Sequence, residues 1–171
     1  LIEDGLTGIV GPNGCGKSNI VESLRWVMGE TSAKSMRGSG MEDVIFSGTS
    51  NKASKNIAEV SIEVENKDKE GPIQYRELEQ IQVRRKIEKD KGSKFYINDK
   101  EVRARDAQMF FADLSTGAHS PSMISQGRIG ALVTAKPTDR RAILEEAAGI
   151  SGLHVRRHEA ELRLGAAENN L

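Results

Sequence analysis

The sequence has one cysteine, Cys15, and no long apolar run. A single cysteine excludes an internal disulfide framework and fits a reducing compartment. No apolar stretch approaches the roughly 20 residues that a membrane-spanning helix needs, and no signal peptide is visible. Lysine and arginine together number 25, as do aspartate and glutamate, so the whole-chain charge argues neither for nor against a polyanionic partner.

The length of 171 residues is enough to bury a substantial core within one domain. The chain starts at Leu1 rather than at a methionine, and we expect it to be a piece of a longer protein.

Eight residues near the start form the most informative motif. Residues 11–18 read Gly-Pro-Asn-Gly-Cys-Gly-Lys-Ser and fit G-x-x-x-x-G-K-[ST], the pattern of a phosphate-binding P-loop. The apolar run at residues 6–10 predicts a buried strand before the loop. Residues 19–28 predict a helix after it, with an apolar face made of Ile20, Val21, Leu24, Val27 and Met28. Because strand, loop and helix follow in the order that the motif needs, a chance glycine-rich turn is the weaker interpretation.

The residue types of the loop explain how it would hold phosphates. Its three glycines let the backbone approach a ligand closely, and successive N–H groups form an anion nest at the positive end of the following helix. Lys17 brings a positive charge to the β- and γ-phosphates, and the Ser18 hydroxyl completes part of a Mg²⁺ shell. Cys15 is best explained as a small loop residue, with redox sensitivity as the alternative.

The rest of the chain predicts an antiparallel meander and two further helices. Residues 57–64 alternate apolar and polar side chains, which is typical of a half-buried strand, and residues 75–87 contain a second one. Residues 95–102 predict a hairpin, because the Asn and Asp at its turn tolerate a positive φ. Helices are predicted at residues 106–114 and from Pro137 onward, with inward residues Met109, Phe110 and Leu114, and Ile143, Leu144, Ala147 and Ala148.

Two polar segments each allow two interpretations. Residues 31–40 form either a solvated loop or a loop that brings Arg37 to a phosphate, a task that suits a guanidinium group, and composition does not decide between them. The second segment, residues 84–94, carries six basic side chains that we call the basic patch: Arg84, Arg85, Lys86, Lys89, Lys91 and Lys94. It is either a solvated edge hairpin or a salt-dependent contact with a phosphate backbone.

Residues 150–171 carry a short heptad seam. Apolar residues and one charged interruption recur there at alternating spacings of three and four, namely Ile150, Leu153, Arg157, Ala160, Leu164, Ala167 and Leu171. Gly165 lowers helix propensity by about 1 kcal/mol, so an ordinary surface helix is the alternative. His154 and His158 lie one helical turn apart and could bind a metal, but solvated histidines are the simpler interpretation.

Several segments, taken in order, resemble bacterial SMC (structural maintenance of chromosomes) proteins, a chromosomal branch of the ATP-binding-cassette (ABC) ATPases. The resemblance rests on the P-loop with the Asn19 that follows it. It also rests on segments further along the chain, namely residues 25–30, 35–38, 41–48, 124–128, 135–137, 139–141 and 145–150. Because these matches run along nearly the whole chain, the resemblance is far more specific than the P-loop alone.

This resemblance implies an α/β fold, an ABC-type P-loop NTPase half-domain with an antiparallel β meander that ends in the start of a coiled-coil helix. Residues 1–149 would form the N-terminal lobe of an ATPase head, and residues 150–171 would start the coiled-coil neck.

The resemblance also implies ATP and Mg²⁺ as cofactors and assigns roles by position. The nucleotide would be held by Gly11, Pro12, Asn13, Gly14, Cys15, Gly16, Lys17, Ser18 and Asn19. Ser18 and Gln126, which stands at the Q-loop position, would reach the metal. Lys17, Gln126 and Arg37, at the arginine-finger position, would serve catalysis.

The implied function is to drive chromosome condensation and segregation, with two engaged heads enclosing two ATP molecules. The implied partners are the C-terminal half of the same head, a second SMC head in a homodimer, a kleisin subunit with its associated protein at the neck, and DNA. The implied location is the cytoplasm, at the nucleoid, without a membrane partner.

The sequence departs from the complete head in one respect that matters for catalysis. It has no LSGG-type signature and no apolar strand that ends in Asp-Glu. These would supply a phosphate contact across the dimer, a second Mg²⁺ carboxylate and the general base. We therefore predict that this chain alone binds nucleotide weakly and hydrolyses it negligibly.

Two alternatives remain open: the head of another coiled-coil ABC ATPase that acts in DNA repair, and a partner- or DNA-binding module without turnover of its own. A small P-loop kinase or a transporter nucleotide-binding domain fits less well, because no acceptor site or lid is evident and a transporter domain would lack the seam.

Overall fold

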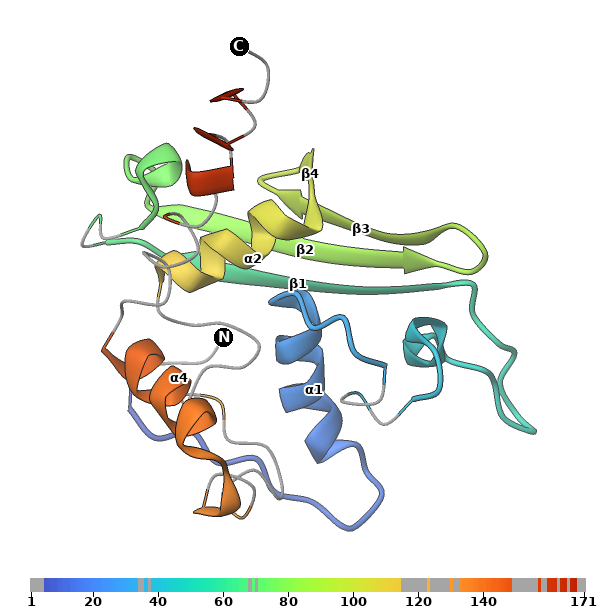
Figure 1. Ribbon diagram of the computed structural model, residues 1–171. Coiled ribbons are helices and arrows are strands. Elements are labelled where there is room, and N and C mark those ends of the chain that lie inside the picture. Colours follow the sequence, from blue (N-terminus) through green and yellow to red (C-terminus); the bar gives the residue numbers. More distant parts are fainter. Residues whose placement is uncertain are drawn as a thin grey trace.

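The structure is a computed structural model that describes residues 5–33, 36, 38–67, 69, 71–114, 123, 130, 133–148, 157, 160–162, 164–165 and 167–168. A four-stranded antiparallel sheet lies on one side of the molecule (Figure 1). Helix α2 (Ala104–Asp113) and the C-terminal end of helix α1 (Lys17–Val27) pack against one face of this sheet, and α1 extends away from it (Figure 1).

The sheet is a simple meander in the order β1-β2-β3-β4. Its strands are β1 (Ile57–Glu65), β2 (Gln80–Glu88), β3 (Gly92–Ile97) and β4 (Lys100–Val102). Along β1, every second residue is half-buried, and along β2 every second residue is fully buried. The predicted antiparallel meander is therefore confirmed, because a period of two fits a sheet with one covered face.

The second strand begins later than the start of residues 75–87, the segment in which it was predicted. Ile73–Tyr75 forms a 3-10 turn, η3, and β2 begins only at Gln80. The buried Asn66 holds this connection, because its Nδ2 donates to the carbonyl oxygens of Arg76 at 3.1 Å and of Leu78 at 2.9 Å.

The hairpin between β3 and β4 turns at the predicted residues. Asn98 and Asp99 have φ values of 47° and 62°, which are the positive angles of a tight hairpin turn. The Asn98 side chain also accepts a hydrogen bond from Gln82 N at 2.8 Å, so the turn is tied to the neighbouring strand.

Among the residues that the structure describes, two buried clusters form the core. The larger one joins α1, the sheet and α2 and contains Val27, Ile81, Val83, Ile97, Phe110 and Phe111. The smaller one contains Trp26, Ile45 and Ile87, with Met36 and Val44 packed against it. Through this second cluster, the segment after α1, including the 3-10 turn η2 (Met41–Val44), packs against the sheet.

The two later helices form where they were predicted, with differences in detail. Helix α2 begins at Ala104, two residues before the predicted start, because Asp106 accepts a hydrogen bond from Arg103 N and so closes its first turn. Helix α4 (Pro137–Ala147) starts at the predicted proline. The predicted inward orientation of Leu144 and Ala148 is wrong, because both are exposed and the described residues give them no cover. The side chains of Ile143 and Ala147 lie outside the described residues.

The strand predicted at residues 6–10 is also wrong. These residues adopt no regular structure, and Leu6 and Val10 are exposed. A buried strand needs neighbours that pair with its backbone and cover its side chains, and the described part of the chain supplies none at this place. Ile20, predicted on the inner face of α1, is exposed for the same reason.

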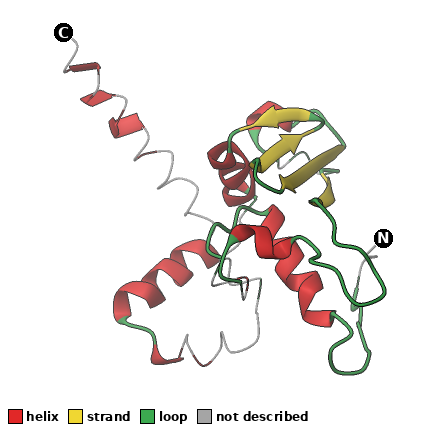
Figure 2. Cartoon of the chain, turned by 90° about the vertical axis from the view of Figure 1, so that its right-hand side faces the viewer, coloured by secondary structure: helices red, strands yellow, loops and turns green. Residues whose placement is uncertain are grey.

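Near the C-terminus, the described residues between 157 and 168 are helical and stand away from the sheet (Figure 2). Four members of the predicted seam lie among them, and of these Leu164 is exposed. His154 and His158 lie outside the described residues. No helix in the described part of the chain is long and apolar enough to cross a membrane.

Candidate nucleotide-binding site

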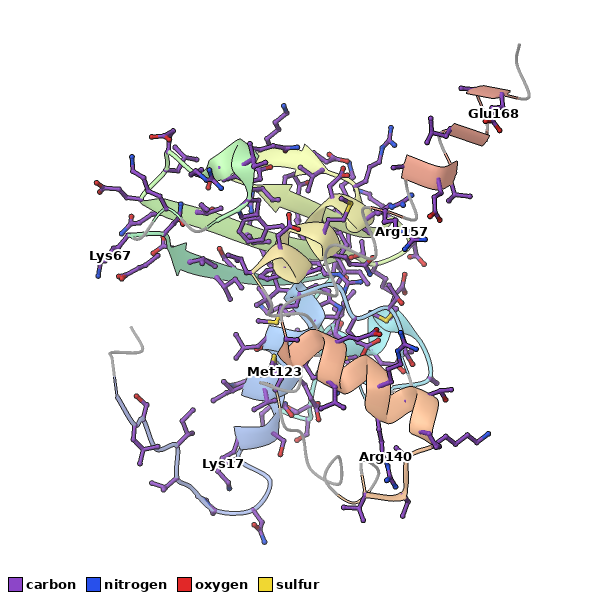
Figure 3. The ribbon with its side chains drawn as sticks, turned by 60° about the vertical axis from the view of Figure 1, so that its left-hand side comes forward. Lys17, Lys67, Met123, Arg140, Arg157 and Glu168 are labelled. Atoms are coloured by element: carbon purple, nitrogen blue, oxygen red, sulfur yellow. The ribbon has the colours of Figure 1, made fainter. Side chains whose placement is uncertain are left out.

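The predicted P-loop lies at the N-terminal end of α1, on the side away from the sheet, as the position of Lys17 in Figure 3 shows. The helix begins at Lys17, two residues earlier than predicted, so that both Lys17 and Ser18 lie in its first turn. Gly14 and Gly16 have φ values of 80° and 91°. L side chains rarely adopt such angles, which explains the glycines at these positions.

The loop is narrow at its first glycine. A Cβ atom added to Gly11 would lie 2.8 Å from Cys15 Sγ. The Cys15 sulfur therefore already fills the space beside Gly11, and a larger side chain at position 15 would not fit there. This packing explains the small residue that was expected at position 15.

Lys17 holds the loop closed through its own side chain. Its Nζ donates to the carbonyl oxygens of Gly11 at 2.5 Å and of Pro12 at 2.6 Å. The ammonium group thus lies inside the curve of the loop, where the motif requires a cation for phosphates.

The start of α1 has the electrostatic character of an anion site. No acidic residue lies in its first turn, and no described side chain caps it. The first N–H groups of the helix and its positive dipole end are therefore directed at the P-loop, where a phosphate would be stabilised. The structure thus brings together the predicted residues 11–19, whereas Arg37 and Gln126 lie outside the described residues.

A cavity beside α1 was not predicted. It has a volume of about 390 Å³ and lies between α1, η2 and β1. Its lining combines polar residues of α1 with apolar residues of the sheet, namely Asn19, Glu22, Ser23, Trp26, Met36, Asp43, Val44, Ala58 and Val60. The spacing of Asn19, Glu22, Ser23 and Trp26 marks one helical face, which is the sequence signal that could have located it.

The opposite end of α1 is fixed by buried charges, which the sequence analysis missed. Arg85 Nη1 donates to the carbonyl oxygens of Trp26 and Glu30, both at 2.7 Å. Its guanidinium group lies 4.5 Å from the ring centre of Trp26 and 4.6 Å from that of Phe95. A second arginine, Arg25, pairs with the buried Glu30 carboxylate at 2.8 Å.

Burial lowers the pKa of Arg85 to about 10, and the nearby Glu30 charge partly opposes this shift. The side chain is therefore still a cation at neutral pH. Its charge is stabilised by carbonyl oxygens at the negative end of α1, which is the favourable place for a cation on a helix.

The basic patch does not form one surface. Arg85 points into the core, so its assignment to a solvated or DNA-binding surface is wrong. Arg84 pairs with Glu59 and Asp99, and the remaining ion pairs of the patch are Lys86 with Glu88, Lys91 with Glu88, and Lys94 with Glu101. These pairs compensate much of the positive charge of the patch.

Comparison with known proteins identifies the family. The family model for the RecF/RecN/SMC N terminal domain matches residues 1–128. The chain belongs to this family. Proteins called "Chromosome partition protein Smc" from Cereibacter sphaeroides and Rhodopseudomonas palustris are 58% and 56% identical to it over 171 residues. The matches cover the whole chain but 15% of each relative, so the chain spans a small part of their length.

Solved SMC heads share the fold. The Smc head domain of Pyrococcus furiosus, bound to the C-terminal domain of ScpA, matches with a TM-score of 0.73 at 29% identity. The match covers 93% of this chain and 39% of the P. furiosus chain. A chain from work on ATP-driven dimerization and DNA-stimulated activation of SMC ATPases has a TM-score of 0.72 at 30% identity, with coverage of 85% and 86%. The predicted resemblance to SMC proteins and the predicted fold class are both confirmed.

Proposed function

We propose that this chain is the ATP-binding lobe of an SMC ATPase head, and that the protein to which it belongs uses ATP to partition and condense chromosomes. The observation that carries the proposal is the P-loop at the free end of α1, with the Lys17 ammonium group inside it. Residues 11–19 would bind the phosphates, and ATP with Mg²⁺ would be the ligand.

The chemistry of the lobe would be positioning and charge stabilisation. Lys17 and the N-terminal N–H groups of α1 would bind the β- and γ-phosphates, and Ser18 would offer its hydroxyl to Mg²⁺. Bound Mg²⁺ would neutralise charge on the transferred phosphoryl group. By sequence position, Arg37 would stabilise the transition state and Gln126 would contribute to the metal site.

The lobe would need the C-terminal half of the same head. The apolar side chains of Leu6, Ile9, Val10 and Ile20 are exposed in the described part of the chain. A sheet supplied by the second half would give residues 6–10 pairing partners and bury these side chains. It would also bring the signature motif and general base that this sequence lacks.

The remaining partners follow from the relatives. A P. furiosus Smc head is bound to ScpA, and other SMC ATPases undergo ATP-driven dimerization and DNA-stimulated activation. We propose equivalent partners here: a second head, a kleisin subunit with its associated protein at residues 150–171, and DNA. The family model also includes RecF and RecN, but identities of 58% and 56% to Smc proteins favour the chromosomal function over a repair ATPase.

Nucleotide binding by the chain and its Lys17→Ala variant tests the proposal. Binding of Mg-ATP, measured by calorimetry, should weaken at least about tenfold in the variant, because a charge-assisted contact to phosphate is lost. Thermal unfolding without nucleotide should be unchanged, since the described partners of Lys17 lie within its own loop. Equal ATP affinity of the two proteins would contradict a nucleotide site at the P-loop.

A further inference from the structure

The loop between η2 and β1 carries positive charge and no carboxylate. We call residues 47–56 the lysine loop. From Val44 to Ala58, the only charged side chains are those of Lys52 and Lys55. The other polar side chains of the loop are hydroxyls and amides, namely those of Ser47, Thr49, Ser50, Asn51, Ser54 and Asn56. All of these polar side chains are exposed.

Backbone hydrogen bonds give the lysine loop a compact shape. Thr49 N donates to Lys52 O at 2.8 Å, and Lys52 N donates back to Thr49 O at 3.3 Å. Lys55 N donates to Phe46 O at 2.8 Å, which closes the base of the loop. A Cβ atom added to Gly48 would lie 3.0 Å from the backbone nitrogen of Ser54, so the two arms of the loop pass close together. Both lysines are therefore presented from one folded turn.

A third lysine lies at the same end of the sheet. Lys89 N donates to Asn56 O at 2.9 Å, so the turn between β2 and β3 lies against the end of the lysine loop. Figure 1 shows the lysine loop and this turn at the end of the sheet where β1 begins and β2 ends. Lys89 is exposed, as Lys52 and Lys55 are. We call these three residues the lysine cluster.

The lysine cluster differs from its basic neighbours because its charges are not paired. Lys86 and Lys91 both lie 3.1 Å from a carboxylate oxygen of Glu88. Within the part of the chain that the structure describes, no member of the lysine cluster has a carboxylate at ion-pairing distance. The positive charge of the basic patch is thus compensated along the strands and left uncompensated at this end of the sheet.

Neither stability nor solubility explains the lysine cluster. Exposed, unpaired cations contribute little to folding, and like charges that lie close together repel one another. A solvated loop does not need to exclude carboxylates, because surfaces of mixed charge serve solubility equally well. Cations accompanied by hydroxyl, amide and backbone N–H donors are, in contrast, the groups that contact phosphate oxygens and sugars of DNA.

We propose that the lysine cluster binds the phosphate backbone of duplex DNA, which lies across the end of the sheet where β1 begins. The inference rests on the proposed function, which includes DNA as a partner, and it names the residues that make the contact. Contacts to phosphates carry no sequence information and release counterions. Binding through the lysine cluster is therefore independent of sequence and sensitive to salt.

The test uses the complete protein that contains this chain, with a non-hydrolysable ATP analogue present. The cluster variant combines Lys52→Gln, Lys55→Gln and Lys89→Gln, and each change is also made singly. The control variant removes three other lysines, each paired with a carboxylate: Lys67→Gln, Lys69→Gln and Lys94→Gln. Both variants lose the same charge. Fluorescence anisotropy on two duplexes of unrelated sequence, over a range of salt concentrations, gives Kd and its salt dependence.

The cluster variant should lower the slope of log Kd against log salt by about 2.7, the value for three phosphate contacts, and each single change by about 0.9. At 0.1 M salt its affinity should fall more than about tenfold, equally for both duplexes. The control variant should keep the wild-type slope. Affinity for the ATP analogue and the thermal unfolding temperature should be unchanged in both variants, because all the replaced side chains are exposed.

A further variant tests the sign of the charge effect. Asp90 follows Lys89 directly, is exposed and has a φ of 62°, which asparagine also adopts. Asp90→Asn should tighten DNA binding, because it removes a negative charge beside the lysine cluster without changing the backbone. Weaker binding by this variant would contradict a phosphate contact at this turn.

Three results would overturn the inference while the proposed function stands. One is a cluster variant with the slope of the wild type, and another is an equal loss in the cluster and control variants, which marks a general charge effect. The third is a cluster variant that loses binding to poly-glutamate but keeps its slope on DNA, since the surface would then belong to an acidic protein partner. If the wild-type protein does not bind DNA at all, or Lys17→Ala leaves its ATP affinity intact, the proposed function itself fails.

Discussion

Arg85 contacts Trp26 in two ways. Its Nη1 donates to the Trp26 carbonyl oxygen at 2.7 Å, and its guanidinium carbon lies 4.5 Å from the centre of the Trp26 ring. A residue of the sheet therefore holds the C-terminal end of the helix whose other end carries the P-loop. The relationship explains how a small meander fixes the orientation of α1.

Replacing Arg85 should destabilise the fold far more than replacing its neighbour Arg84. Arg85→Met removes the guanidinium donor to the Glu30 carbonyl oxygen and one of two donors to the Trp26 carbonyl oxygen, which also accepts from Gly29 N. We expect a loss of about 3 kcal/mol, as for breaking a buried charge network. Arg84 pairs with partly exposed carboxylates, so Arg84→Met should lose about 1 kcal/mol or less. Denaturant unfolding measures both changes, and equal losses would show that Arg85 does not anchor α1.

Gly29 is the second fixed point at this end of α1. Its φ is 103°, and an added Cβ would clash with the side chain of Gln108, whose Nε2 donates to Gly29 O at 2.8 Å. We expect Gly29→Ala to lower the free energy of unfolding by about 1–3 kcal/mol through strain at the positive φ and this clash.

Gly40→Ala is the control for Gly29→Ala, because Gly40 has a φ of −137° and open space around its Cα. Adding Gln108→Ala to Gly29→Ala should remove the clash but not the backbone strain. A harmless Gly29→Ala would mean that the helix end is not closely packed.

Asp43 should titrate below an ordinary aspartate. The hydrogen bond from Gly40 N, followed by those from the Ser39 hydroxyl and Ser39 N, lowers the pKa of this carboxyl from 3.8. Because the folded pKa lies below the unfolded one, its contribution to stability is present above the unfolded pKa and is lost as pH falls through the folded pKa.

NMR titration of the Asp43 carboxyl measures this shift directly. Ser39→Ala should move the pKa back toward 3.8, because it removes the hydroxyl donor. Amide exchange at Ser39 and Gly40 should accelerate as the carboxyl is protonated. An Asp43 pKa that is unaffected by Ser39→Ala would contradict the hydrogen bond between the Ser39 hydroxyl and the Asp43 carboxylate.

The outer face of the sheet should contribute little to DNA binding. Lys94 is paired with Glu101 at 3.0 Å, and this pairing raises the pKa of Lys94, so its charge is already compensated. In the complete protein, Lys94→Gln should therefore leave the slope of log Kd against log salt unchanged. A phosphate contact would instead contribute about 0.9 to that slope, so a decrease of this size would place DNA on the sheet.

The sequence predicted the elements whose signal is local. The alternation in residues 57–64 depends only on which face of a strand is covered, and the turn at Asn98 and Asp99 depends on two residues that tolerate a positive φ. The P-loop is likewise a local backbone motif, and the structure places it, as expected, at the start of a helix.

The predictions that were wrong concern residues whose burial depends on partners far along the chain. Residues 6–10 are as apolar as a buried strand, but burial requires neighbouring strands that the described residues do not provide. Arg85 was grouped with surface cations because of its charge. Its position in the alternation Ile81, Val83, Arg85, Ile87 already placed it on the inner face, so the period was a better guide than the residue type.

The most direct test of the account is ATP turnover by this chain, before and after addition of a separately expressed C-terminal half of the same head. We predict no turnover by the chain alone, and turnover in the mixture that Lys17→Ala abolishes. Turnover by the chain alone that is also lost on Lys17→Ala would contradict the account, because the catalytic base would then lie within these 171 residues.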